Sequence, residues 1–388
     1  MPKVKIFTID VTFCEVMLDN DLEHRTTRYF QLSSQLAGLD NSQLHSLFGD
    51  RESGTSSLNW GRNYTIVLGQ SKVFVKRIPI TTIEYENSFS TKNLYNLPTY
   101  FNYGVGSIGL NVFRELITHI KTTNWVLEGE SASFPLMYHY RIIPLSGLRK
   151  DVDLEKHKAF VEYWGNNTSI ENYLLDRANT KYELILFLEY IPHVLAIWLQ
   201  ENPNHLQKYL DELHKTITFL RTKGIIHFDA HFYNILTDGQ QTYLTDFGLV
   251  LDNSFSLTKD EEFFFQQNQF YDYGEILRNL GHLIRLSYDL CSERNQRTIR
   301  EKYDIKEDLT PYEIGARLLD NIEQLSADKL MKLDQFYVTS ILKYRSIIEL
   351  MQNFFVEMCT NNNKNIKFPH AKLQKLLEET GFVHSGYS

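Results

Sequence analysis

Residues 224–251 read G-I-I-H-F-D-A-H-F-Y-N-I-L-T-D-G-Q-Q-T-Y-L-T-D-F-G-L-V-L, and the expected fold follows from this stretch. Its short apolar runs lead into or follow three polar side chains, those of Asp229, Asn234 and Asp246. The Asp-Gly pair at 238–239 is a turn signal of the hairpin type. We therefore expect a loop followed by a β-hairpin, which carries two carboxylates and one amide oxygen to one edge. Hard oxygen ligands of this kind suit Mg²⁺ bound to phosphates.

The order of these residues resembles that of a known family. His227, Asp229 and Asn234 form the pattern H-x-D-x-x-x-x-N, and D-F-G follows from Asp246. This combination is similar to the catalytic and metal-binding loops of the protein-kinase-like superfamily. A lone H-x-D would be weak, but here the spacing, the hairpin turn and the position of D-F-G agree. The resemblance implies an α+β, bilobal protein-kinase-like fold, with a small antiparallel β-rich N-lobe that holds one key helix and a larger, mainly helical C-lobe.

Two upstream residues complete the resemblance. The run V-F-V-K ends at Lys76 and resembles the strand whose lysine contacts the α- and β-phosphates of ATP. Taken alone, Lys76 would be read as a surface lysine at a strand end. Residues 111–121 have helical spacing, and Glu115 on that helix matches the carboxylate that pairs with the lysine. The gap between the two residues is longer than usual for kinases, and an insertion at 81–110 accounts for the excess.

The parts of the site that would hold the nucleotide are less regular. The segment from Gly54 reads G-T-S-S-L-N, so the G-x-G-x-x-G pattern is absent, although Ser56 and its neighbours can still offer donors to phosphate. The apolar run at 182–191 is expected to be a buried strand that ends at the hinge between the lobes. By resemblance, backbone groups of Glu189 and Ile191 would then face the adenine.

The chain divides into three parts on this interpretation. Residues 1–48 form an N-terminal extension packed on the N-lobe, with alternation at Val4 and Ile6, less regularly at Val11 and Phe13, and then a helix around Leu36. Residues 49–191 form the N-lobe, with insertions near 81–110 and 147–180. Residues 192–388 form the helical C-lobe with the catalytic loop and D-F-G. The insertion at 81–110 ends in Y-F-N-Y-G-V-G-S-I-G, and we interpret it as a packed flap in preference to a substrate contact.

Composition narrows the possible partners and location. The chain has 388 residues, 43% of them hydrophobic, which is enough for a well-supplied core. Its net charge of −8 argues against nucleic acid, because phosphate contacts need a clustered basic surface. The three cysteines lie far apart, as is common in a reducing compartment. With no signal peptide or membrane span evident, the expected location is the cytoplasm.

These residues have separate expected roles in phosphoryl transfer, which needs positioned phosphates, neutralised charge and an oriented acceptor. Asp229 accepts or orients the proton of the acceptor hydroxyl, and His227 braces the catalytic loop. Asn234 and Asp246 hold Mg²⁺. Lys76, positioned by Glu115, grips the phosphates of ATP.

The acceptor is the open question. Phe228 precedes Asp229 where regulated kinases carry Arg, so we expect no activation by phosphorylation between residues 249 and 271. His231 resembles the loop of aminoglycoside and choline phosphotransferases, and no A-P-E segment follows D-F-G. D-F-G and V-F-V-K are nevertheless protein-kinase-like. The sequence therefore predicts a divergent bacterial-type Ser/Thr kinase-like protein acting on Ser or Thr of a protein. The alternatives are a small-molecule kinase and a non-catalytic nucleotide-binding module.

Overall fold

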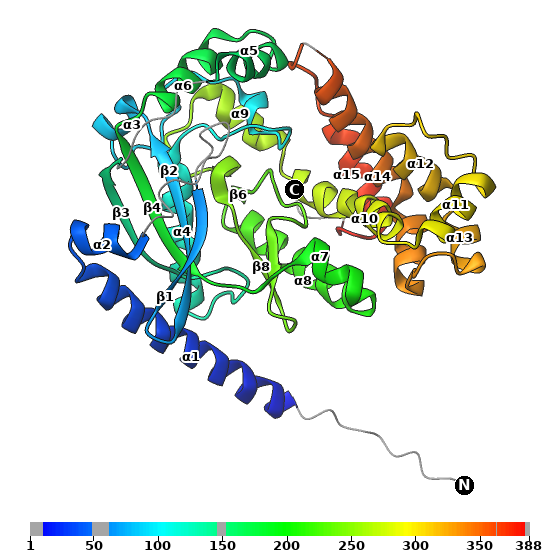
Figure 1. Ribbon diagram of the computed structural model, residues 1–388, viewed down its shortest axis with the longest axis horizontal. Coiled ribbons are helices and arrows are strands. Elements are labelled where there is room, and N and C mark those ends of the chain that lie inside the picture. Colours follow the sequence, from blue (N-terminus) through cyan, green and yellow to red (C-terminus); the bar gives the residue numbers. More distant parts are fainter. Residues whose placement is uncertain (1–10, 49–61, 146–152, 362, 385–388) are drawn as a thin grey trace.

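The computed structural model describes residues 11–48, 62–145, 153–361 and 363–384, with side chains from residue 22 onward and without that of Arg62. It is a mixed α+β protein with a small antiparallel sheet and many helices (Figure 1). This confirms the fold prediction at the coarse level. The arrangement as a bilobal kinase fold stays a prediction.

Four antiparallel strands form the main sheet, in the order β1-β2-β4-β3. They are β1 (Arg62–Leu68), β2 (Ser71–Ile80), β3 (Met137–Pro144) and β4 (Tyr182–Glu189). Gly69 and Gln70 alone connect β1 to β2, and Gly69 has φ +59°, which a side chain would make costly. All of β4 from Glu183 to Glu189 is buried, as expected for a central strand. Lys76 lies on β2 opposite Leu186.

Helix α4 (Val112–Leu127) covers one face of this sheet. Its Phe113 and Leu116 pack with Ile80 of β2 and Leu184 of β4 in a separate apolar cluster. Asn111 caps the helix, because its side chain accepts a hydrogen bond from the N–H of Phe113 and so satisfies a free donor of the first turn.

The first helix of the chain begins earlier than the sequence suggested. Helix α1 runs over Val11–Ala37 and packs against β3, and α2 spans Asn41–Phe48. The expectation of irregular alternation at Val11 and Phe13 is therefore wrong, because both positions are helical. Val4 and Ile6 lie outside the described residues.

Two segments interrupt the sheet. The first, 81–110, holds α3 (Thr82–Glu86) and the 3₁₀ turn η2 (Thr99–Asn102), and is otherwise ordered loop. The second contains α5 (Leu154–Tyr163) and α6 (Thr168–Ala178). Trp164, which follows α5, packs on Phe101 of the first segment with ring centroids 4.6 Å apart. The two insertions therefore support one another.

The predicted loop and hairpin are present. Strands β7 (Ile235–Thr237) and β8 (Thr242–Leu244) pair antiparallel across a four-residue loop, and β5 (His193–Val194) extends this small sheet. Strand β6 (Ile225–Ile226) pairs with β9 (Leu251–Asp252), and the 3₁₀ turn η4 (Phe247–Leu249) lies between β8 and β9. The residues of the sequence motif therefore lie in loops between these short paired strands.

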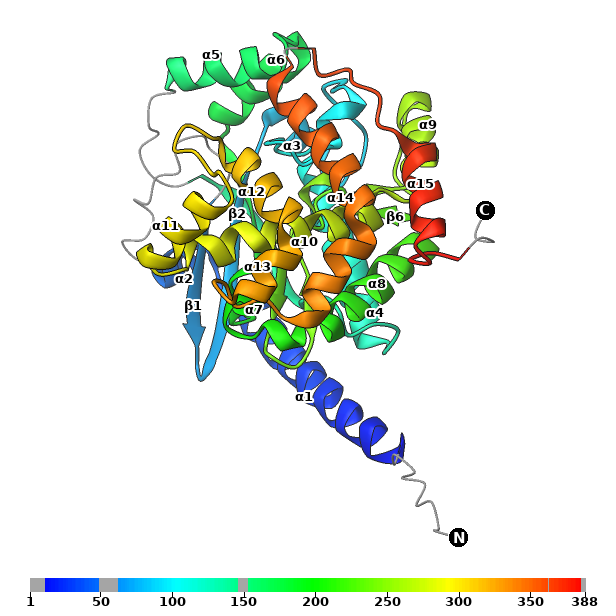
Figure 2. The same ribbon diagram turned by 90° about the vertical axis from the view of Figure 1, so that its right-hand side faces the viewer.

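Helices make up the rest of the molecule, to the right of the sheet in Figure 1. They are α7 (Leu195–Glu201), η3 (Pro203–His205), α8 (Leu206–Thr222), α9 (Lys259–Gln267), α10 (Tyr271–Asp289), α11 (Glu293–Lys302), α12 (Pro311–Asp320), α13 (Ile322–Asp328), α14 (Gln335–Thr360) and α15 (His370–Glu379). Figure 2 shows α14 crossing in front of α10, and these two helices pack closely. Helix α9 was not predicted. No helix within the described ranges is both long and apolar enough to cross a membrane.

Candidate active site

Lys76 lies at the centre of a charged cluster. Its Nζ is 2.6 Å from Oε1 of Glu115 and 2.8 Å from Oδ1 of Asp246. Burial by itself lowers the pKa of this lysine, but the two carboxylates raise it by more than burial lowers it. The net pKa is therefore above its ordinary value. The ammonium group is therefore charged across the physiological range and is held by two anions.

Helix α4 fixes the position of Glu115. Arg114 makes a buried ion pair with Glu261 of α9, at 2.7 Å. Two turns further along, Lys121 pairs with Asp252 of β9, at 2.5 Å. Both pairs connect α4 to the chain that follows D-F-G, so the helix cannot turn without breaking them. Glu115 is thereby kept directed at Lys76.

The D-F-G loop has an unusual backbone that presents its aspartate. Asp246 has φ 63° and ψ 73°, in the left-handed region that few residues other than glycine enter. Phe247 is fully buried between two histidine rings, with its centroid 4.7 Å from His119 of α4 and 5.4 Å from His227. Burial would raise the pKa of Asp246, but Lys76 lowers it, to a net value of about 2. Asp246 is therefore a stable anion.

The catalytic loop holds a second carboxylate in a different state. The side-chain amide of Asn234 donates to Oδ2 of Asp229 at 2.8 Å and to its carbonyl oxygen at 3.1 Å. Nε2 of His231 is 3.5 Å from Oδ1 of Asp229. Burial raises the pKa of Asp229 to about 6, while His231 acts in the opposite direction. A carboxylate with a raised pKa is a better proton acceptor than an ordinary aspartate.

His227 braces the loop from inside, as expected. The side chain is fully buried, its Nε2 is 3.1 Å from the carbonyl oxygen of Thr245, and its Nδ1 accepts from the N–H of Asp229 at 3.2 Å. Burial lowers the pKa of His227 to about 4, so the ring is neutral at pH 7. Because it is enclosed, His227 acts through the loop and does not reach a substrate.

Helix α10 supports the catalytic loop through hydrogen bonds to the backbone of that loop. Asp272, in its first turn, accepts hydrogen bonds from the backbone N–H groups of His227 (2.6 Å) and Phe228 (2.9 Å). Asn279, two turns later, accepts from the N–H of Phe232 at 3.1 Å. The sequence signal for this support is an acidic residue in the first turn of a helix that begins shortly after D-F-G.

Phe228 belongs to an aromatic cluster. It is fully buried with φ 64°, and its ring stacks on Phe264 of α9 at 5.3 Å and lies 5.1 Å from Tyr271 of α10. Tyr103, from the first insertion, joins the cluster at 5.9 Å. An arginine at this position would need an anionic partner. Phe228 instead holds the loop by apolar packing.

Glu189, one of the two residues predicted to contact adenine, is paired with a residue of helix α1. The N–H of Glu189 donates to the carbonyl oxygen of Leu136 at 2.7 Å, and its carboxylate pairs with Arg25 of α1, also at 2.7 Å. Ile191 follows the strand and is half-buried. Gly54 and Ser56 lie outside the described residues.

The two predicted metal ligands lie on adjacent segments, since the N–H of Thr245 donates to the carbonyl oxygen of Asn234 at 3.0 Å. The amide oxygen of Asn234 is not used in the contact with Asp229, and one oxygen of Asp246 is not used by Lys76. The described part of the chain holds no group of three or more His, Cys, Asp or Glu placed to bind a metal. Mg²⁺ in nucleotide sites takes one or two protein carboxylates and completes its shell with phosphate and water oxygens, so this donor set fits it.

The first insertion reaches the catalytic residues. A Cβ added to Gly104 would lie 2.3 Å from Oδ1 of Asp229, and one added to Gly109 would lie 2.3 Å from the carbonyl oxygen of Gly248. The chain therefore passes in contact with both the catalytic loop and D-F-G. The sequence indicated a packed flap here. The glycines at 104–109 were a signal for a close approach of the backbone, but not for the two residues that it contacts.

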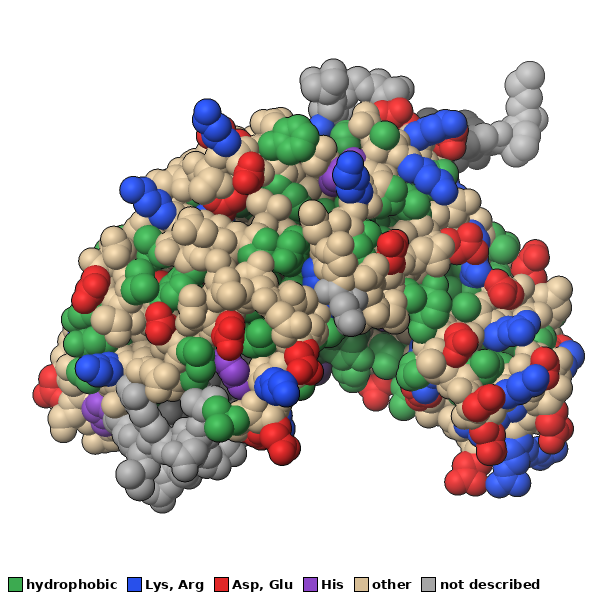
Figure 3. Space-filling view, turned by 90° about the horizontal axis from the view of Figure 1, so that it is seen from above, with side chains coloured by type: hydrophobic (Ala, Val, Ile, Leu, Met, Phe, Trp, Pro, Cys, Tyr) green, Lys and Arg blue, Asp and Glu red, His purple; other side chains and the backbone are tan. Residues whose placement is uncertain are grey.

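Figure 3 shows the molecule hollowed between the part that carries the sheet, on the left, and the helical part on the right. No protein-family model matches this sequence, and no curated protein is similar to it at a significant level. The functional conclusion therefore depends on the site itself.

Proposed function

We propose that this protein is an ATP- and Mg²⁺-dependent phosphotransferase that moves the γ-phosphate of ATP to a hydroxyl acceptor. The observation that carries the proposal is the cluster of Lys76, Glu115 and Asp246 beside a catalytic loop in which Asn234 holds Asp229. These are five charged or polar side chains from four separate segments. A fold that had lost the chemistry would have no need to keep all five together.

The proposed reaction uses each group once. Lys76 contacts the α- and β-phosphates and keeps the nucleotide in register. Asp229 takes the proton of the acceptor hydroxyl while the oxygen of that hydroxyl forms a bond to the γ-phosphorus. The bond between that phosphorus and the β–γ bridging oxygen breaks, and ADP leaves with the electron pair.

Mg²⁺ would be held by Asn234 and Asp246, and it would neutralise charge on the phosphates. The net pKa of Asp246 near 2 supports this, because a metal ligand has to be deprotonated. In the form described here Asp246 is paired with Lys76. Binding of Mg-ATP would give both groups new partners of opposite charge.

The test measures binding and transfer separately. Thermal shift and calorimetry report the binding of Mg-ATP, and γ-labelled ATP reports transfer to acceptors, to water or to the protein itself. Lys76→Met and Asp229→Ala are compared with Lys375→Met, which changes an exposed lysine of α15 in the same manner. We expect wild type and Lys375→Met to bind and turn over, Asp229→Ala to bind without turnover, and Lys76→Met to lose turnover.

The opposing outcomes are distinct. Binding without turnover in wild type would contradict the enzyme and leave the non-catalytic nucleotide-binding module. Transfer of the AMP part of ATP would contradict γ-phosphate transfer and indicate a reversed orientation of the nucleotide. Absence of Mg-ATP binding would contradict both.

A further inference from the structure

The segment at 101–109 runs along one side of the catalytic residues. Gly104 contacts Oδ1 of Asp229 and also approaches the carbonyl oxygen of Phe228. Gly109, with φ +85°, contacts the backbone of Gly248. The segment therefore extends from the catalytic loop to the D-F-G loop, and backbone atoms without side chains make both contacts.

Aromatic side chains hold the start of this segment. Phe101 is fully buried against Trp164. Tyr103 is 2% exposed and has five aromatic neighbours with ring centroids 4.9–6.0 Å away. These are Phe228, Phe264, Tyr271, Phe354 and Phe368. Its hydroxyl group donates to Asn268 at 3.3 Å. Removing a ring buried in this way would leave a cavity and destabilise the segment.

Further contacts hold the end of the segment. The hydroxyl group of Tyr163 donates to the carbonyl oxygen of Val105 at 2.8 Å. Beyond the segment, Asn111 donates to the carbonyl oxygens of Ser90 and Lys92 while it caps α4. The segment is thus fixed on both sides of Gly104, which makes it a wall and not a lid.

The position of this wall limits which acceptors can approach Asp229. A serine or threonine hydroxyl is one short side chain away from its own backbone, so a protein acceptor must bring an extended chain close to the carboxylate. The backbone of the wall already occupies that space beside Oδ1. The carboxylate side chain is 20% exposed, with His231 beside it at 29%, and Tyr233, whose ring is next to that of His231, is 51% exposed. A compact molecule can enter there without a chain on either side of its hydroxyl.

We infer that residues 101–109 form a fixed wall of the acceptor site, and that the acceptor is a low-molecular-mass alcohol and not a serine or threonine of a protein. The inference rests on the proposed function and narrows its acceptor. It departs from the sequence prediction, which favoured a protein. Gly104 is then a positioning residue, because its missing side chain lets the wall touch Asp229.

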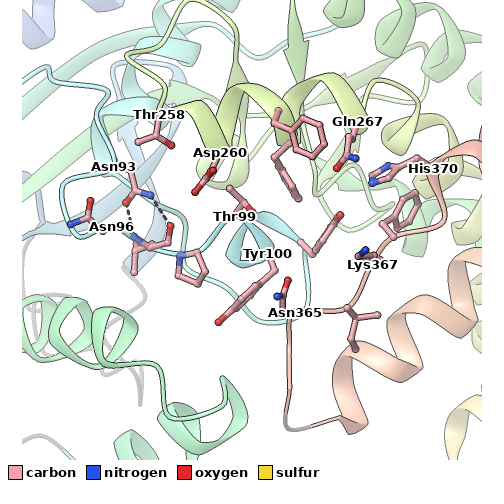
Figure 4. Close-up of a pocket in the computed structure, with 17 residues that line it drawn as sticks. Asn93, Asn96, Thr99, Tyr100, Thr258, Asp260, Gln267, Asn365, Lys367 and His370 are labelled. Atoms are coloured by element: carbon pink, nitrogen blue, oxygen red, sulfur yellow. Dashed lines mark hydrogen bonds between the residues drawn. The ribbon is translucent and has the colours of Figure 1, made fainter.

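The outer face of the wall borders a separate cavity of about 760 Å³ (Figure 4). Thr99 and Tyr100 line it together with Asp260 of α9 and Lys367 and His370 near α15. Among the described residues that line it there is none of Lys76, Asp229, Asn234 or Asp246. This cavity therefore lies behind the wall and is not the place of the reaction, so its volume is no guide to the size of the acceptor.

Hydrogen exchange and an acceptor assay test the wall with the full chain. Exchange is followed by mass spectrometry for peptides that cover 101–109, with and without Mg²⁺ and a non-hydrolysable ATP analogue. The exposed turn at 306–308 serves as the internal reference. A fixed wall predicts exchange at least about tenfold slower than in that turn, in both states, because the backbone N–H groups of Phe101, Tyr103 and Val105 donate to the carbonyl oxygens of Pro98, Tyr100 and Tyr103.

The acceptor assay compares a degenerate Ser/Thr peptide library with ethanolamine, choline, glycerol, glucose and an aminoglycoside. We expect at least one low-mass alcohol to accelerate ATP turnover several-fold and the library to leave it at the rate of hydrolysis. Fast exchange across 101–109 would overturn the wall, and phosphorylation of the library dependent on Asp229 would overturn the acceptor class. Failure to bind Mg-ATP would contradict the proposed function, while the exchange result would still report on the wall.

Discussion

Different interactions hold the two sides of the site. On the phosphate side, Lys76 is held by two carboxylates, and α4 is fixed by two further ion pairs. On the acceptor side, Asp229 lies against the backbone of Gly104, above an aromatic cluster that includes Phe228. Charge organises the first side, and shape organises the second.

On the proposed function, the difference follows from what each side would have to recognise. The phosphates of ATP carry the same charge in every nucleotide, so fixed ionic partners suit them. An acceptor would be selected by its shape, and apolar packing fixes the shape of a binding site better than flexible charged side chains do. The pKa values show the same division, with Asp246 near 2 and Asp229 near 6. Each prediction below changes one side and measures both.

The largest effect is expected from a pair of carboxamide variants. Asp229→Asn removes the proton acceptor, so transfer should fall by about 10²–10⁴-fold, the usual contribution of a general base, with Mg-ATP affinity unchanged. Asp246→Asn should instead weaken Mg-ATP binding, which calorimetry would detect. If both variants lost nucleotide affinity equally, the separation of the two sides would be wrong.

The next effect is expected from a single methyl group. Gly104→Ala places a Cβ 2.3 Å from Oδ1 of Asp229, so the wall or the carboxylate must shift. A displacement on this scale should lower transfer by about 10²-fold and leave nucleotide affinity near wild type. Gly315→Ala on α12 is the matched control, because its new Cβ meets no atom within 4 Å. Equal activity in the two variants would show that Gly104 does not position Asp229.

The pH dependence of transfer should be smaller but diagnostic. Burial raises the pKa of Asp229 to about 6, so its proton-accepting form is lost as the pH falls through that value. The rate in the free enzyme should therefore drop about tenfold per pH unit below 6 and level off above 7. His231→Ala should move the midpoint upward, since His231 lowers this pKa. A rate that stays constant down to pH 5 would contradict the role of Asp229.

The smallest effect on transfer is expected outside both sides. Arg25→Ala leaves the buried carboxylate of Glu189 without this ion pair, which should destabilise the fold by about 3–5 kcal/mol. Arg297→Ala, from an exposed pair with Glu293, should cost at most about 1 kcal/mol. Chemical denaturation compares the two. Transfer per folded molecule should stay near wild type, and a selective loss of transfer in Arg25→Ala would give α1 a catalytic role.

Local spacing predicted the elements that carry the site. The loop and hairpin at 224–251, the helix of Glu115 and the strand of Lys76 all follow from short-range patterns of apolar residues and turn signals. The pairing of Lys76 with Glu115 also agrees with expectation. The elements could be predicted because each depends on residues close together in sequence, whereas the family resemblance implied the pairing of Lys76 with Glu115, 39 residues apart.

Other contacts between distant residues could not be predicted. Nothing in the sequence indicates that Gly104 touches Asp229 or that Arg25 pairs with Glu189. Each depends on how separate elements pack, and a single polar residue has many possible partners. Helix α9 was missed for a related reason, because its three consecutive phenylalanines at 263–265 hide the helical period.

The aromatic surroundings of Tyr103 have a consequence for biosynthesis. The ribosome makes Tyr103 early, Phe228 in the middle of the chain, and Phe354 and Phe368 late. The wall therefore cannot close on its final neighbours while the catalytic loop is newly made. On the proposed function, a nascent chain would hold its catalytic carboxylates before it holds the structure that selects an acceptor, and selectivity would be the last property that the growing protein acquires.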